Sequence, residues 1–153
     1  MSPVGRVVSG LATTVAMVLT LAGCGSDDAI TAAPQASAPA CTALTGRLPT
    51  TVLGRSRTAL KVAGAAAWGD PAIVLRCGVP PTGPTTDQCL EANGLDWVIT
   101  DTKDAVRYVS YGRTPAVEVT VPAAVGPANA SGALIDLAEA VRPLPVSTTC
   151  IGP

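Results

Sequence analysis

Alternating apolar and polar residues predict four β-strands from residue 72 onward. The four stretches are residues 72–79, 95–100, 106–111 and 117–121. In each, apolar side chains recur at every second position, which is the period of a strand with one buried face. Short connections between the last three strands favour antiparallel neighbours. A shorter alternation over 57–62 predicts an edge strand, and we expect 64–70 to be irregular.

Two helices are predicted on either side of these strands. Cys41, Leu44 and Leu48 share one helical face before Pro49. Near the other end, the spacing of apolar residues over 134–141 predicts a second helix, which Pro143 ends. Strands with one apolar face need cover on that face only. We therefore expect an α+β fold, a two-layer sandwich of about four mainly antiparallel strands with both helices on one face.

The N-terminal region has the pattern of a lipoprotein signal peptide. Arg6 precedes an apolar run over 7–21, and the run ends in Leu21-Ala22-Gly23-Cys24. A positive residue, a short apolar run and small residues define a secretion signal, and the run is shorter than the ~20 residues of a membrane span. We expect cleavage after residue 23 and a diacylglycerol on Cys24. The alternative is an ordinary signal peptide or anchor helix with a coincidental cysteine.

The predicted signal peptide and lipidation site divide the chain into three parts. Residues 1–23 are the predicted signal peptide, 24–40 a flexible tether rich in Ala, Pro and Ser, and 41–153 a single domain. Two acyl chains suffice for stable anchoring, so the membrane is the predicted partner. The expected location is the outer face of the cytoplasmic membrane.

Four cysteines remain for the domain, and an even number in an exported chain predicts two disulfides. They are Cys41, Cys77, Cys89 and Cys150. Zinc is disfavoured, because the chain has no histidine and no C-x-x-C spacing. Four cysteines permit three pairings. We favour Cys41–Cys150, which would join the ends of the domain, with Cys77–Cys89, and leave the other two pairings open.

Composition excludes several classes of function. The net charge is −1 with acids and bases interspersed, which gives no basic stripe for nucleic acid. Without histidine there is no Ser-His-Asp or Cys-His arrangement. The sequence contains no P-loop, G-x-S-x-G or G-x-G-x-x-G motif, and no cofactor is predicted.

Two groups of residues are candidates for chemistry. Asp96, Asp101 and Asp104 would suit a calcium site or an acid/base pair, but a solvated turn explains them more simply. In Trp68-Gly69-Asp70-Pro71 the Trp beside an Asp would suit a ligand pocket, and the alternative is core packing before a turn.

Charged positions on the strands form a further group. The side chains of Arg76, Asp96, Arg107 and Glu118 would form cross-strand pairs if their strands are adjacent. Arg55, Arg57 and Lys61 make a small basic patch suited to anionic lipid or wall polymers.

Three strings of the sequence resemble one family. They are Ala66-Ala67-Trp68-Gly69-Asp70-Pro71 continuing to Val79, Asn93-Gly94-Leu95-Asp96-Trp97 after Cys89, and Gly112-Arg113-Thr114-Pro115 continuing to Val119. The chain is similar to domain of unknown function 3515, an actinobacterial family of small exported proteins, often lipoproteins. The resemblance implies one cysteine-bridged exported domain and implies no activity.

We therefore expect a membrane-anchored, non-catalytic binding or accessory module of the cell envelope, with envelope proteins or wall polymers as partners. Its candidate ligand or partner surface comprises Trp68, Asp70, Arg76 and Asp96. One alternative is a small enzyme acting on wall or lipid precursors through Asp70 and Asp96. Another is a small-ligand carrier with a pocket near Trp68.

Overall fold

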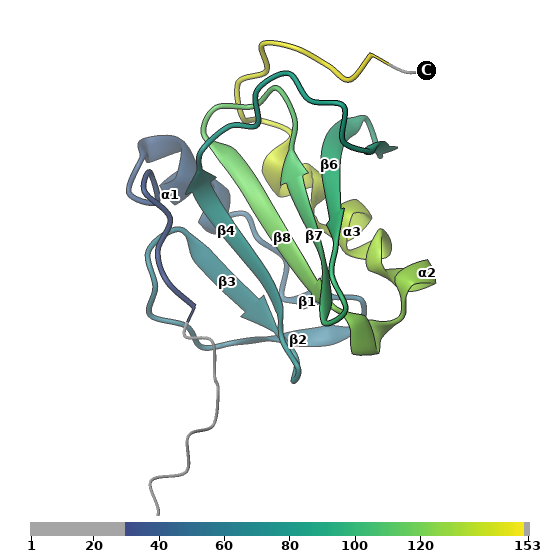
Figure 1. Ribbon diagram of the computed structural model, residues 1–153. Helices are drawn as coiled ribbons and strands as arrows, with labels where there is room; N and C mark the ends of the chain where they lie inside the picture. Colours follow the sequence, from purple (N-terminus) through teal and green to yellow (C-terminus); the bar gives the residue numbers. More distant parts are fainter. Residues whose placement is uncertain (1–29, 152–153) are drawn as a thin grey trace, which may run out of the picture.

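A single antiparallel sheet of eight strands forms the body of the protein, with helices on one face (Figure 1). The computed structural model describes residues 30–151. The predicted signal peptide and Cys24 therefore lie outside the described residues. Within residues 30–151, no helix is long and apolar enough to cross a membrane. The predicted α+β class with a mainly antiparallel sheet is confirmed, but four strands were too few.

The elements follow one another along the chain in two groups of strands. The first group and its helix are α1 (Pro39–Thr45), β1 (Thr51–Val52), β2 (Arg55–Thr58), β3 (Ala65–Trp68) and β4 (Ile73–Val79). The second is β5 (Cys89–Ala92), β6 (Leu95–Asp101), β7 (Ala105–Ser110) and β8 (Ala116–Pro122). A 3₁₀ turn η1 (Ala123–Val125) and helices α2 (Pro127–Ala130) and α3 (Gly132–Val141) follow.

The two groups are meanders joined at the centre of the sheet. The strand order is β1-β2-β3-β4-β8-β7-β6-β5, so the last strand returns to pair with β4. Residues 80–88 carry the chain from β4 at the centre to β5 at the edge. The register across the junction places Leu75 opposite Val119 and Arg76 opposite Glu118. These pairs assign one face of the sheet to apolar residues and the other to charged ones.

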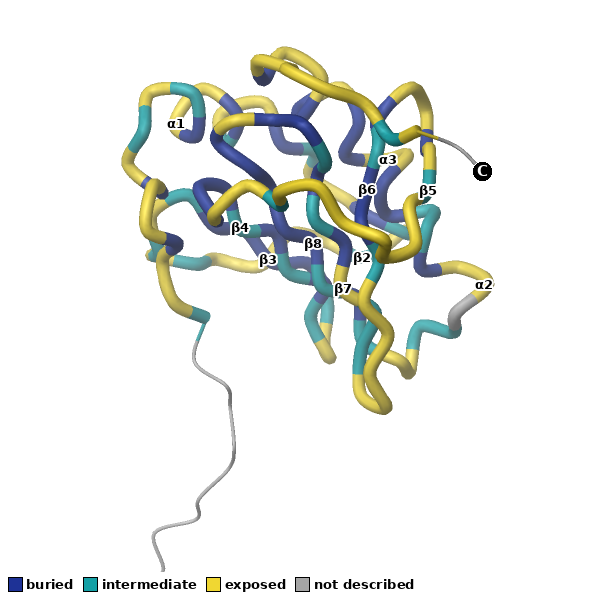
Figure 2. Tube along the Cα trace, turned by 45° about the horizontal axis from the view of Figure 1, so that its top comes forward, coloured by how far each residue is buried: buried dark blue, intermediate teal, exposed yellow. Residues whose placement is uncertain are grey.

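The inner face of the sheet carries the core. Leu75, Trp97 and Val119 are fully buried there, beneath Leu44 of α1 and Leu137 of α3. The i, i+3, i+4 spacing that predicted α3 matches its buried side, so this helix is confirmed. The first helix is also present, but α1 ends at Thr45, and the buried Leu48 lies beyond it instead of on its last turn. Figure 2 shows the buried residues concentrated in the strands of the sheet and beneath the exposed connecting loops.

Strands β1, β3 and β5 were not predicted. Residues 64–70 were expected to be irregular, but Ala65–Trp68 forms β3 and is buried at all four positions. A strand buried on both faces has no polar alternation to reveal it. Strands β1 and β5 are only two and four residues long. The edge strand expected over 57–62 lies instead at Arg55–Thr58.

The outer face is covered at one end by the chain that precedes α1. Ala33 and Ala36 are buried against Val79 and Ala116. The amide of Gln35 donates to the carbonyl of Gly78 (2.9 Å). Gly78 has a φ of +98°, and a Cβ there would overlap the backbone of Gln35. From Ala33 onward, the segment expected to be a tether therefore packs on the domain.

The disulfides pair Cys41 with Cys77 and Cys89 with Cys150, with Cα–Cα distances of 5.5 and 6.5 Å. Two disulfides were predicted correctly, but the favoured pairing was wrong. Cys77 points to the inner face of β4, beneath α1, whereas Cys89 points to the outer face of β5 at the sheet edge. Side chains on opposite faces and four strands apart cannot bond.

Candidate ligand groove

An open groove lies on the outer face, over strands β5 and β6. Its volume is about 730 Å³. One wall is residues 85–88 and the other is Cys150 and Ile151; Cys89, Glu91 and Asp96 form the floor. A smaller hollow of about 190 Å³ shares Cys89 and Cys150 and extends to Val98 and Tyr111. The groove is therefore built from two segments that meet only in the folded chain.

The β5–β6 hairpin aims the acidic side chains into the groove. Glu91 pairs with Asp96 across the ladder, and Cys89 pairs with Val98, so all four share the outer face. The two-residue connection is Asn93-Gly94, both with positive φ (52° and 76°), which fits the twist of a tight hairpin. The Glu91 carboxylate accepts the amide N–H of Gly94 at the same turn.

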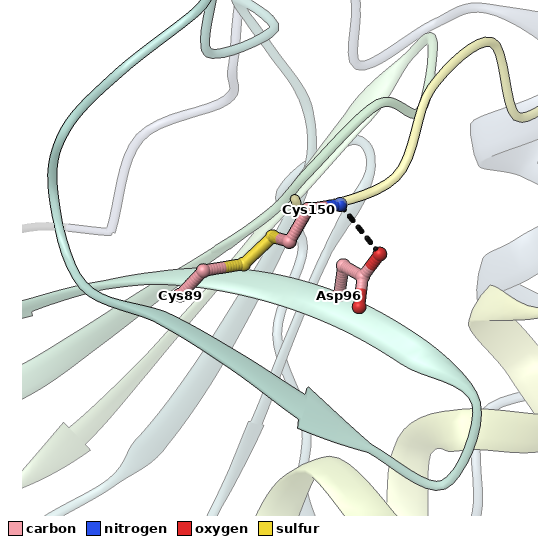
Figure 3. Close-up of side chains that lie close together, drawn as sticks. All are labelled: Cys89, Asp96 and Cys150. Carbon is pink, nitrogen blue, oxygen red and sulfur yellow. Dashed lines mark hydrogen bonds between the residues drawn. A yellow bond between two sulfur atoms is a disulfide. The ribbon is translucent and has the colours of Figure 1, made fainter. Parts of the chain in front are cut away.

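The C-terminal segment reaches the groove through a series of backbone contacts. The amide of Ser147 donates to the carbonyl of Gly112 (2.8 Å), and Val146 bridges to Arg113. At the groove, the amide of Cys150 donates to Asp96 Oδ2 (2.9 Å) beside the Cys89–Cys150 disulfide (Figure 3). Asp96 thus orients the tail as well as lining the groove.

The groove is negatively charged. Its lining includes the carboxylates of Asp87, Glu91 and Asp96 and no lysine or arginine. The nearest buried cation is Arg113, which donates to the carbonyl oxygens of Arg142 and Leu144. Burial lowers the pKa of Arg113, the charge of Arg142 lowers it further, and Asp96 acts in the opposite direction. The excess of carboxylates in the lining favours ligands that carry positive charge or many hydrogen-bond donors.

The side chains of Cys89, Asp96 and Cys150 come within 4.8 Å of one another, the spacing of a metal site. Metals bind cysteine as the thiolate, and both sulfurs are held in the disulfide. Only the Asp96 carboxylate is left as a ligand from this trio, so the oxidised form does not fit a zinc ion.

Comparison with known families decides where the chain belongs. Residues 7–148 match the family described as protein of unknown function (DUF3515). The chain is a member of this family. No curated protein and no solved structure matches it significantly.

The strings that carried the resemblance to DUF3515 lie at turns of the sheet. Trp68-Gly69-Asp70-Pro71 leads from β3 into β4, and Gly112-Arg113-Thr114-Pro115 leads from β7 into β8. Gly112 approaches the backbone of Thr148 so closely that a Cβ would overlap it. The string Gly112-Arg113-Thr114-Pro115 therefore packs against the C-terminal segment and positions it as a wall of the groove.

The four residues of the predicted ligand surface do not form one site. Trp68 is fully buried in the core, and its indole N–H donates to the carbonyl of Pro49 (3.1 Å). Asp70 is exposed in the β3–β4 turn. Arg76 and Asp96 share the outer face, but β8 and β7 separate their strands by roughly 15 Å. Of the four, only Asp96 lines the groove.

The predicted cross-strand charge pairs are present in part. Glu118 accepts hydrogen bonds from Arg76 and Arg107, both at 3.2 Å. Asp96 does not join them. It also lies at the opposite end of β6 from Asp101, roughly 17 Å away along a strand, so the three aspartates form no calcium site.

Sequence reasoning missed Asp87 and Glu91, which line the groove beside Asp96. Both flank Cys89 closely, and that proximity of two acids to a cysteine was the available signal. This signal alone does not predict a groove, because β5 is too short to show an alternating pattern and because the groove also needs Cys150 beside Cys89.

Proposed function

We propose that this protein is a lipid-anchored binding module on the outer face of the cytoplasmic membrane, and that the acidic groove is its ligand surface. The observation that carries the proposal is the groove: it is large, open to solvent, and lined by three carboxylates. A groove of this volume fits a small molecule or one segment of a polymer. The acids select partners rich in positive charge or hydrogen-bond donors, such as envelope proteins or wall polymers.

The sequence supports the anchor. The signal-like run before Cys24 and the two disulfides both fit an exported chain. Cys24 is only nine residues before Ala33, the first residue buried in the domain. Nine residues extend ~30 Å at most, so the anchor would hold the domain near the bilayer.

The positions of the two ends of the described chain suggest that the groove faces away from the membrane. The first described residues enter at the lower edge in Figure 1, while the C-terminal segment that walls the groove crosses the opposite end. An anchor at the entering end leaves the groove facing away from the membrane, toward the wall.

A binding role fits the groove better than catalysis does. The enzyme hypothesis needed Asp70 and Asp96 together, but Asp70 lies in the β3–β4 turn, and β8 and β7 separate β4 from β6, which carries Asp96. The sulfurs that line the groove are joined to each other, which leaves no free thiol nucleophile there. The carrier hypothesis needed a pocket at Trp68, which is fully buried.

Two experiments test the proposal. A Cys24→Ala variant of the full chain, grown with a labelled fatty acid, is expected to lose the label and to keep residues 1–23, because the predicted cleavage depends on Cys24. A variant that still carries the label would exclude Cys24 as the lipid anchor. For the groove, a photo-crosslinking residue at position 86 is compared with one at 103, in the exposed β6–β7 turn.

We expect position 86 to capture one defined envelope component, and the Asp87→Asn/Glu91→Gln variant to lose that capture. The matched control is Asp101→Asn/Asp104→Asn, which removes the same charge away from the groove. Equal capture at 86 and 103, or equal loss in both charge variants, would refute the groove as the ligand surface.

A further inference from the structure

The two disulfides lie in opposite environments. Cys41 and Cys77 are fully buried in the main core. Cys89 is exposed, Cys150 is half-buried, and both line the groove. A thiol must reach a sulfur atom to exchange with a disulfide, so a buried bond reacts only after the structure opens. Only the second disulfide can be attacked in the folded protein.

We propose that Cys89–Cys150 is a thiol–disulfide exchange site, selective for small thiols that carry a positive charge. The attacking thiolate bonds to the sulfur of Cys89, the more exposed partner. The Cys89–Cys150 bond breaks, and Cys150 leaves with the electron pair and takes up a proton. A second thiol then attacks the mixed disulfide, releasing the Cys89 thiol and the oxidised small disulfide. The small thiols supply both electrons.

The groove supplies the selectivity. Asp87, Glu91 and Asp96 surround the disulfide without a lysine or arginine in the lining. A thiolate is itself an anion, so this field opposes its approach. A second negative charge on the reagent increases that repulsion, whereas an ammonium group offsets it. An aminothiol such as cysteamine is therefore the favoured reagent, and a sulfonate thiol the disfavoured one.

Exchange removes the covalent bond that holds Cys150 against β5. Cys150 is held by the disulfide and by one hydrogen bond to Asp96. Before it, the segment contacts the β7–β8 turn through Thr114 to Pro145 (3.2 Å) and Ser147 to Gly112 (2.8 Å). Breaking the covalent link leaves noncovalent contacts to hold one wall of the groove, among them a second hydrogen bond from the Ser147 hydroxyl to the carbonyl of Gly112 (3.1 Å). The exchange site thus controls the groove without depending on the ligand proposed above.

The test uses the oxidised full chain in mild detergent. Three thiols are applied at low salt: cysteamine, mercaptoethanol and mercaptoethanesulfonate. Alkylation at intervals, followed by mass spectrometry of peptides, reports each disulfide separately. We expect Cys89–Cys150 to be reduced at least about 100-fold faster than Cys41–Cys77. Relative to an uncharged model disulfide, the cysteamine-to-sulfonate rate ratio should be about 10-fold higher.

Controls separate the groove charge from other causes. The ratio should fall to the model value in Asp87→Asn/Glu91→Gln and persist in Asp101→Asn/Asp104→Asn. In the unmodified chain it should also fall at 1 M salt, where charges are screened within about 3 Å. Equal reduction of both disulfides would overturn the exchange site. If the cysteamine-to-sulfonate rate ratio changed neither in Asp87→Asn/Glu91→Gln nor at 1 M salt, the proposed selectivity would be overturned.

Discussion

The guanidinium of Arg113, in the turn between β7 and β8, donates to the backbone carbonyl of Arg142 at the end of helix α3 (3.1 Å). The same nitrogen also donates to the carbonyl of Leu144. Carbonyls at a helix end have no partner within the helix. One buried side chain therefore satisfies the carbonyl at the C-cap of α3 and the carbonyl of Leu144 just beyond the helix, and it joins the helix layer to the sheet.

Replacing Arg113 should destabilise the fold strongly. Arg113→Met keeps the aliphatic stem but leaves both carbonyls without their donor, so we expect a loss of about 3 kcal/mol in the free energy of unfolding. The control is Arg142→Met, because the side chain of Arg142 is 44% exposed, against a buried Arg113, and its loss should be at most about 1 kcal/mol. Urea unfolding followed by circular dichroism measures both, and equal losses would contradict the role of Arg113.

Glu118 should contribute more than an ordinary surface acid. Its side chain is only 10% exposed and accepts hydrogen bonds from two arginines. Glu118→Gln keeps the shape but leaves two neighbouring cations facing a neutral amide. Because Arg76 and Arg107 remain partly exposed, we expect a loss of only about 1 to 2 kcal/mol in the free energy of unfolding.

A matched pair on the same sheet provides the control for Glu118. Lys103 and Asp104 approach to 3.8 Å, but both side chains are largely exposed. Asp104→Asn should therefore change the free energy of unfolding by less than about 0.5 kcal/mol. Similar losses for both variants would mean that burial of Glu118 adds nothing.

Two glycines allow the cost of backbone strain to be measured separately from the cost of a steric overlap. Gly54 and Gly112 both have positive φ (+71° and +68°). A Cβ at Gly54 meets nothing within 4 Å, whereas a Cβ at Gly112 overlaps the backbone of Thr148. We expect Gly54→Ala to cost about 1 kcal/mol in stability, and Gly112→Ala about 3 kcal/mol.

Hydrogen exchange tests where Gly112→Ala disturbs the structure. Displacing Thr148 should also break the bond from the Ser147 amide to Gly112, so that amide should lose its protection in Gly112→Ala. Protection that stays equal in the two variants would show that the tail does not depend on this contact.

Stability should depend on pH through Tyr108. Burial raises the pKa of its hydroxyl, and the charge of Asp101 raises it further. The folded state therefore favours the protonated form. This contribution is complete below the ordinary tyrosine pKa of about 10 and is lost as pH rises through the higher pKa of the folded state.

Urea midpoints measured at increasing pH test this linkage. Above about pH 10, the unfolding free energy should fall more steeply in the unmodified chain than in Tyr108→Phe. Asp101→Asn removes the second cause and brings the folded-state pKa closer to the unfolded value, so its fall should begin at the same pH but be smaller. Parallel curves for the unmodified chain and Tyr108→Phe would contradict the raised pKa.

Regular alternation explains how much of the fold was predictable. In β4, β6, β7 and β8, apolar residues on the inner face alternate with outer-face residues several of which are polar, so their period was visible. β3 is buried at every position from Ala65 to Trp68, which removes that period. β1 has two residues, too few for any pattern. What could be predicted was the set of strands with one partly wet face.

The candidate site was less predictable, because it depends on which face each cysteine occupies. Cys77 and Cys89 are close in sequence but lie on opposite faces of the sheet. That difference follows from the register of β4 and β5, and β5 was not foreseen. Asp96 lines the groove, and its neighbours Asp87 and Glu91 reach the same groove only through the β5–β6 hairpin and the loop before it.

The positions of the two disulfides have a consequence for the integrity of the chain. Cys41–Cys77 closes a loop within the first meander, and Cys89–Cys150 closes one within the second. Neither disulfide of the described residues 30–151 spans residues 80–88, which are almost entirely exposed. A protease cut there would produce two pieces, each closed by its own disulfide and held to the other by noncovalent contacts, chiefly the β4–β8 pairing and the shared core. The backbone at residues 80–88 is thus the one covalent connection between the two halves of the described domain.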